Sequence, residues 1–247
     1  MSGYEIGVQR AWRGLMRGAE ARIDRVGTLG TPLAKPVGAE TPPTLLVHGF
    51  GNTSSAFGAV QRSLERDGFR VTTIDLPNFG FGDAMEDARL VATRVDEIRA
   101  ATGSDVVNVV GHSRGGLVAR AAQQLLEQPS GIGRVVTLAS ANGGLHLGPL
   151  DRALGGALPE GMQQIRRGSS LITDLHATRG MADAVAVGTN GFDGVLAPAG
   201  SARIDGAPFR PVDVGRTIGP ISRVGHYGIL RDDRAFEAIR DALTAAS

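Results

Sequence analysis

The segment 106–116, VVNVVGHSRGG, limits the possible folds of this chain more than any other stretch. An apolar, β-branched run ends at Gly111, and a helix-forming run, LVARAAQQLLE, follows the glycines after Ser113. In a G-x-S-x-G pattern of this kind the serine takes a strained backbone conformation, and the glycines leave room for the neighbouring strand and helix. The segment therefore predicts a strand, a sharp turn that exposes the Ser113 hydroxyl at the C-terminal edge of a sheet, and a helix whose positive N-terminus lies beside it.

The rest of the chain repeats this alternation of strand and helix. Apolar strands separated by helical stretches are typical of a parallel sheet that helices cover on both faces. We therefore expect an α/β fold, with a mostly parallel central sheet flanked by helices, in a single domain over residues 42–247. The further elements predicted are strands at 44–49, 70–76, 134–140, 184–189 and 211–214, and helices near 55–67, 86–102 and 233–245.

Two segments fall outside this pattern. Residues 142–182 carry many glycines and prolines before short helical stretches, and an insertion of this length after a strand is a candidate lid or cap. Residues 1–41 contain an amphipathic helix, from Ile6 to Val26, and a connecting loop. We expect this helix to dock on the domain, and attachment to a membrane surface or a partner is the alternative.

Composition excludes several classes of protein. Lysine and arginine number 26 against 25 acidic residues, without a basic stripe, so we expect no binding to nucleic acid. The absence of cysteine excludes disulfides, a thiolate nucleophile and a cysteine-ligated metal. Apolar runs stay well short of the roughly 20 residues of a membrane span, and the N-terminus lacks a signal-peptide pattern. We therefore expect a cytoplasmic protein, with secretion open if a leader peptide has been removed.

A serine hydroxyl becomes a good nucleophile only when a base takes its proton and a third group orients that base. In this architecture the expected order along the chain is serine, acid, histidine, which favours His226 in the glycine-flanked loop RVGHYGIL before the closing helix. His48 and His112 lie in glycine turns, where packing or loop hydrogen bonding is the commoner role. His146 and His176 lie in the irregular insertion, which is a poor mount for a base.

The predicted acid is Asp193, in the loop AVAVGTNGFDGVLAP that follows the strand at 184–189. An aspartate a few residues past a strand end can point its carboxylate at a histidine from the next such loop. Asp193 could instead be an ordinary turn-capping residue. Asp205 and Asp213 are the alternative acids, and Asp213 is the weaker of the two because it falls inside the strand predicted at 211–214.

An oxyanion formed at the serine would need hydrogen-bond donors. The amide of Arg114, directly after the serine, is one candidate, and the amide of Phe50 in the glycine-rich loop HGFGNTSSAF is the second, although that loop could be a plain strand-to-helix turn. Three further phenylalanines fall in loops at strand C-terminal ends, where ligands bind in such sheets. Phe79, Phe81 and Phe192 are therefore predicted to line an apolar pocket, with loop anchoring as the alternative.

The motifs HGFGNTSSAF, GHSRGG, FDGVLAP and VGHYGIL occur in this order over roughly residues 42–245. Together they resemble the bacterial triacylglycerol lipases and esterases of the α/β-hydrolase superfamily. The resemblance implies that Ser113 is the nucleophile, Asp193 the acid and His226 the base, with the amides of Phe50 and Arg114 as the oxyanion hole. The chain differs from the compact lipases in its longer insertion, its N-terminal helix and the arginine after the serine, where many lipases carry methionine or leucine.

The residues and the resemblance predict a serine hydrolase without metal or cofactor that cleaves apolar acyl esters, small or lipid, through an acyl-enzyme. A thioesterase, amidase, acyltransferase or cofactor-free haloperoxidase would use the same three residues. A non-catalytic protein of this fold that binds a ligand or partner is a different class of alternative, because the fold alone does not dictate chemistry. Contact with a lipid surface through the N-terminal helix also stays open.

Overall fold

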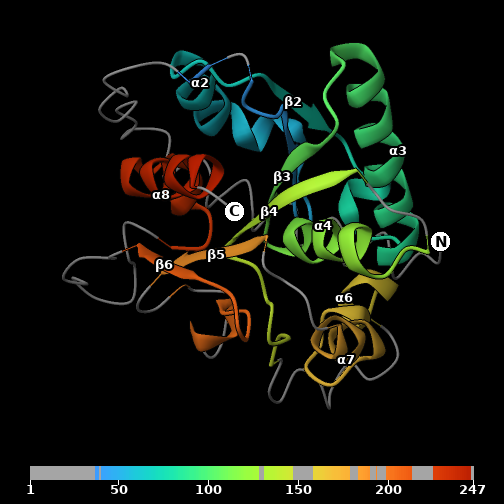
Figure 1. Cartoon of the computed structure of the whole chain (residues 1–247). Helices are drawn as coiled ribbons and strands as arrows, with labels where there is room; N and C mark the ends of the chain where they lie inside the picture. Colours follow the sequence, from blue (N-terminus) through green and yellow to red (C-terminus); the bar gives the residue numbers. More distant parts are fainter. Residues whose placement is uncertain are drawn as a thin grey trace.

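The structure is a computed structural model, and it describes residues 37–38, 40–127, 131–146, 158–178, 183–189, 193, 199–212 and 225–245 (Figure 1). The N-terminal helix expected within residues 1–41 lies outside these ranges. So do Phe192 and Asp213, and part of the 142–182 insertion. The predicted domain that begins at residue 42 contains nearly all of the described chain.

In the described residues six strands form one sheet, in the order β2-β1-β3-β4-β5-β6, and every neighbouring pair is parallel. This confirms the predicted parallel α/β sheet. The chain moves from β1 outward to β2, returns to β3 on the other side of β1 and continues from there to β6. The C-terminal ends of all six strands therefore meet at one edge, with a switch in direction between β1 and β3. The strands are β1 (Thr44–Val47), β2 (Val71–Ile74), β3 (Val107–His112), β4 (Ile132–Leu138), β5 (Ala184–Thr189) and β6 (Phe209–Val212).

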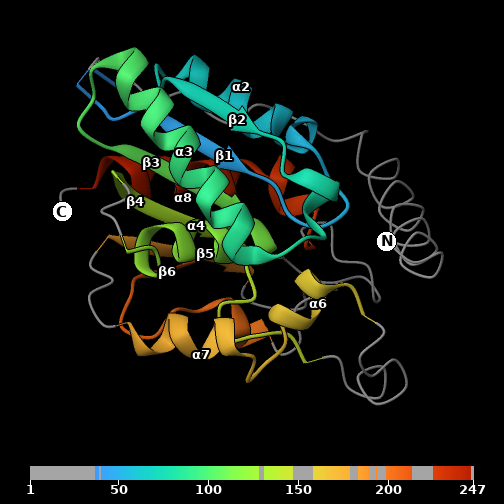
Figure 2. The ribbon, with the colours of Figure 1, turned by 90° about the vertical axis from the view of Figure 1, so that its right-hand side faces the viewer.

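Helices cover both faces of this sheet (Figures 1 and 2). Successive side chains of a strand point to opposite faces, so each central strand needs apolar residues throughout. In β1, Leu45 and Val47 pack in the core formed with two of the helices, whereas Leu46 packs in the core formed with the other two, and all three are fully buried. The first pair is α3 (Ala84–Thr102) and α4 (Arg114–Gln124), and the second pair is α2 (Gly58–Arg66) and α8 (Asp233–Thr244).

The described part of the insertion contains two short helices, α6 (Glu160–Gln164) and α7 (Ser170–Ala177), close to where helical stretches were predicted. Helix α7 is packed against the domain: Arg120 of α4 donates to the carbonyl of Leu175 over 2.9 Å, and Leu175 is buried in the core of α3 and α4. Burial lowers the pKa of Arg120 to about 10. A lid role for this insertion stays a prediction. None of the helices in the described ranges combines the length and the apolar character that crossing a membrane requires.

Candidate active site

Ser113 occupies the turn between β3 and α4 with φ 55° and ψ −127°, a conformation that costs energy for a residue with a side chain. Two glycines make the turn possible. A Cβ at Gly111 would overlap the carbonyl group of Gly115, and a Cβ at Gly115 would overlap the carbonyl oxygens of Val47 and His48. The ends of β1 and β3 and the start of α4 therefore approach one another too closely for any side chain, and this contact holds the serine at the sheet edge.

The three residues predicted to act together lie in one hydrogen-bonded chain. Nε2 of His226 lies 2.9 Å from Oγ of Ser113, and Nδ1 of His226 lies 2.9 Å from Oδ1 of Asp193. The backbone amide of His226 also donates to the carbonyl of Asp193 over 2.8 Å, so two bonds join these residues. Both are 3% exposed. An imidazole held in this way can take a proton from the serine hydroxyl at Nε2 while the carboxylate stabilises the resulting cation.

His112, the last residue of β3, contacts His226 directly. Its Nε2–H donates to the backbone carbonyl of His226 over 2.8 Å, and the centroids of the two rings lie 4.8 Å apart. Burial lowers the pKa of His112, and the neighbouring His226 adds to this effect because two positive rings at this distance would repel; together they bring that pKa to about 3. His112 is therefore neutral at physiological pH and works as a hydrogen-bond donor.

The other described histidines make no hydrogen bond to the serine hydroxyl. His48 donates from Nδ1 to the carbonyl of Gly49 over 2.8 Å and accepts from the amide of Leu76 at Nε2 over 2.9 Å, and burial lowers its pKa. This is the loop hydrogen-bonding role predicted for His48 from its place in a glycine turn. His176 in α7 bonds the carbonyl of Asn142 over 2.9 Å, and His146 is exposed.

The loop after β1 passes beside the serine, as an oxyanion loop must. A Cβ at Gly49 would lie 2.8 Å from Cβ and 3.3 Å from Oγ of Ser113. The next residue is Phe50, the predicted second donor. Within the described residues neither the Phe50 amide nor the Arg114 amide donates to another backbone group, so both N–H groups can serve a ligand. Their role as an oxyanion hole stays a prediction.

Two of the predicted pocket phenylalanines, Phe79 and Phe81, lie in different surroundings. Phe81 is 3% exposed and its ring stacks on that of Phe50, with centroids 5.2 Å apart, so in this structure it anchors one loop on another. Phe79 is 38% exposed, and its carbonyl accepts the amide of Gly51 over 2.9 Å. Phe192 lies outside the described residues. A pocket-lining role for these three residues stays a prediction.

A buried ion pair that the sequence pattern did not predict joins Asp87 to Arg114, the residue after the serine. Nη1 of Arg114 donates to Oδ2 of Asp87 over 2.6 Å, and both side chains are almost completely buried. Burial raises the pKa of Asp87, and the guanidinium of Arg114 opposes that rise. The pattern offered no signal for this contact, because an acidic residue in the first turn of α3 is already explained by the helix dipole.

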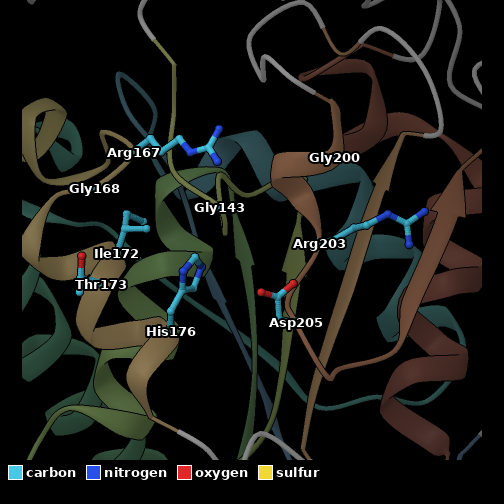
Figure 3. A pocket seen from close by; sticks show the side chains of 9 residues that line it. All are labelled: Gly143, Arg167, Gly168, Ile172, Thr173, His176, Gly200, Arg203 and Asp205. Carbon is cyan, nitrogen blue, oxygen red and sulfur yellow. The ribbon is translucent and has the colours of Figure 1, made fainter.

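A cavity of about 490 Å³ lies between α7, the turn at Gly143 and residues 200–205 (Figure 3). It contains none of the three residues of the hydrogen-bonded chain, and its lining mixes both signs of charge. The described residues also hold no cluster of three side chains that could bind a metal ion. The cavity is lined by Gly143, Arg167, Gly168, Ile172, Thr173, His176, Gly200, Arg203 and Asp205.

A parallel sheet with a serine at the turn after β3, joined through histidine to a carboxylate from a later loop, defines the class of α/β hydrolases. Comparison with known proteins agrees: the chain belongs to the alpha/beta hydrolase fold family, whose match covers residues 42–176.

Two curated relatives are triacylglycerol lipases, from Pseudarthrobacter phenanthrenivorans and Burkholderia plantarii. Each is 33% identical to this chain over 102 residues, which is 37% of this chain. The matched region spans about a third of the length of these relatives, 32% and 28% respectively. Among solved structures, the mature form of the Bacillus licheniformis lipase BlEst2 is similar in fold, with a TM-score of 0.66 at 20% identity over 87% of this chain and 97% of that one.

Proposed function

We propose that this protein is a serine hydrolase that cleaves carboxylic esters through an acyl-enzyme. The observation that carries the proposal is the chain of two 2.9 Å contacts from Ser113 Oγ through the His226 imidazole to Asp193. The strained elbow, the buried carboxylate and the loop beside the serine support the same chemistry.

In the proposed reaction, Oγ of Ser113 attacks the ester carbonyl carbon while Nε2 of His226 takes the hydroxyl proton. Asp193 holds the imidazolium, and the amides of Phe50 and Arg114 donate to the oxygen that becomes negative. Collapse of the tetrahedral intermediate breaks the bond to the alcohol oxygen, which leaves with the proton from His226. Water then attacks the acyl-enzyme with the same base and releases the carboxylic acid and the free serine.

For the substrate we propose an ester with an apolar acyl group. Support comes from the names of the two curated relatives.

The test is hydrolysis of p-nitrophenyl esters from acetate to palmitate by the purified protein, with S113A alongside. We expect hydrolysis by the wild type and a loss of about 10⁴-fold or more in kcat/KM for S113A, because only binding and the oxyanion donors remain. The matched control is S63A, which makes the same change at a buried serine of α2 and should leave kcat/KM unchanged.

Two further arms distinguish the alternatives that share these residues. An acyl-coenzyme A and a p-nitroanilide with the preferred acyl group report thioesterase and amidase activity, and the proposal expects the oxygen ester to be cleaved with the highest kcat/KM. Labelling with a fluorophosphonate, followed by peptide mapping, should modify Ser113. A wild-type protein that hydrolyses no ester, or an S113A variant as active as the wild type, refutes the proposal.

A further inference from the structure

The side chain of Arg114 runs from the N-terminus of α4 into the protein interior rather than into solvent. Its Nη1 donates to the carboxylate of Asp87 over 2.6 Å and its Nη2 donates to the carbonyl of Gly82 over 2.7 Å. The side chain is fully buried. One guanidinium therefore joins the start of α4 to the loop after β2 and to the first turn of α3.

The same guanidinium also reaches the loop after β1. Its central carbon lies 5.3 Å from the centroid of the Phe50 ring, a cation–π distance, and Phe81 stacks on Phe50 with centroids 5.2 Å apart. Phe50 is thus packed against both the guanidinium of Arg114 and the ring of Phe81. Because the backbone of Gly49 passes next to Ser113, these contacts of the Phe50 ring restrain the loop that carries the Phe50 amide beside the serine.

Stability does not explain why this charge is buried. Burying an ion pair costs so much desolvation that a well-packed apolar pair of similar volume is often equally stable. The fork geometry of arginine, however, fixes several partners at once, which an apolar side chain does not do. The buried pair thus holds a particular arrangement of loops.

We propose that Arg114 is a positioning residue: its side chain holds Phe50 so that the amides of Phe50 and Arg114 converge on the oxygen that becomes negative when Ser113 attacks. This inference rests on the proposed ester hydrolysis. The Arg114 amide is fixed by its place at the start of α4, whereas the Phe50 amide belongs to a separate loop. Loss of the side chain therefore displaces one donor and leaves the other, and it weakens binding of the transition state more than binding of the ester.

The test is the double variant R114M/D87L, which removes both charges and leaves no uncompensated buried charge. We expect kcat for the preferred p-nitrophenyl ester to fall about 100-fold, as when one oxyanion donor is lost. KM should stay within about threefold, because ground-state binding is retained. The rate constant for phosphonylation of Ser113 by a fluorophosphonate should fall by a factor similar to that of kcat, since its transition state also places negative oxygen at these amides.

The matched control is R240M/D67L. Arg240 of α8 and Asp67 also form a buried ion pair, with side chains 5% and 1% exposed, and neither residue belongs to the hydrogen-bonded chain of Ser113, His226 and Asp193. The control should keep wild-type kcat and phosphonylation rate. Equal Tm values for the two double variants would separate the loss of rate from a loss of stability.

The outcomes separate this inference from the proposed function. If R114M/D87L keeps wild-type kcat and phosphonylation rate while the wild type hydrolyses esters through Ser113, the positioning role is refuted and the proposed function stands. If the wild type neither hydrolyses esters nor reacts with the fluorophosphonate, both fall. Should the double variant fail to fold, R114K takes its place in the test. Lysine keeps the positive charge but lacks the forked guanidinium, so we expect kcat to be about tenfold lower than in the wild type. A wild-type kcat for R114K would overturn the inference.

Discussion

The neutral, buried imidazole of His112 makes the stability of this protein depend on pH. In the unfolded chain the pKa of His112 is the ordinary 6.5, and in the folded protein burial lowers it to about 3. The unfolded chain therefore takes up a proton that the folded protein refuses, and stability is lost as the pH falls from about 6.5 toward 3. Integrating this linkage from pH 7.5 to pH 5 gives a loss of about 2 kcal/mol from this residue alone.

The variant H112Q isolates that contribution. Glutamine does not titrate but still offers an N–H group to the carbonyl of His226, which His112 contacts over 2.8 Å. Urea unfolding of both proteins, followed by far-UV circular dichroism, gives the free energy of unfolding at each pH. All other titrating groups are shared, so the difference between wild type and H112Q should shift by about 2 kcal/mol in favour of the variant between pH 7.5 and pH 5.

A second non-titrating substitution at the same position is the control. H112N should differ from H112Q in stability at pH 7.5, because its side chain is shorter, but it should show the same pH dependence relative to the wild type. If the stability of the wild type and of both variants falls in parallel between pH 7.5 and pH 5, the reasoning about His112 is refuted.

Two further predictions concern a carboxylate and an ion pair. D193N should lower kcat/KM by about 10⁴-fold with little change in Tm, because an amide no longer holds the correct tautomer of the base. The control D205N should leave kcat/KM unchanged. An equal loss of kcat/KM in both variants would contradict the assignment of Asp193 as the acid. R240M should lower the free energy of unfolding by about 2–3 kcal/mol, because the buried carboxylate of Asp67 loses its closest cationic partner and keeps the weaker contact with Arg66 over 3.5 Å. The control is R94M, which removes the exposed partner of Glu97 and should lower the free energy of unfolding by under about 1 kcal/mol in the same urea titration.

Local patterns were enough to predict much of the fold. The period of the apolar residues predicted the strands and helices within a few residues, and their alternation predicted a parallel sheet, which the structure confirms. Two strands begin two residues before their predicted starts: β4 (Ile132–Leu138) was predicted at 134–140 and β6 (Phe209–Val212) at 211–214. The proline at position 211 lies inside β6 at the edge of the described sheet, where a missing N–H is tolerated.

The candidate site was predictable only in part. Ser113 could be located from its own neighbours, because a strand, glycines and a helix specify the turn locally. Asp193 and His226 could be proposed from their order in the chain and their loops, but Asp205 stayed open as the acid. The described structure brings Asp193 to the imidazole and places Asp205 on a separate cavity.

Other features could be decided only by the tertiary structure. Asp87 and Arg114 are 27 residues apart in the chain, and His112 and His226 are 114 apart, so no local pattern relates them. These contacts exist because parallel strands bring all their C-terminal loops to one edge, where each loop packs against the others. Short-range periodicity encodes the strands and helices. Burial in the packed domain is what requires a partner for the charge of Arg114 and keeps His112 neutral, and burial depends on the whole tertiary structure.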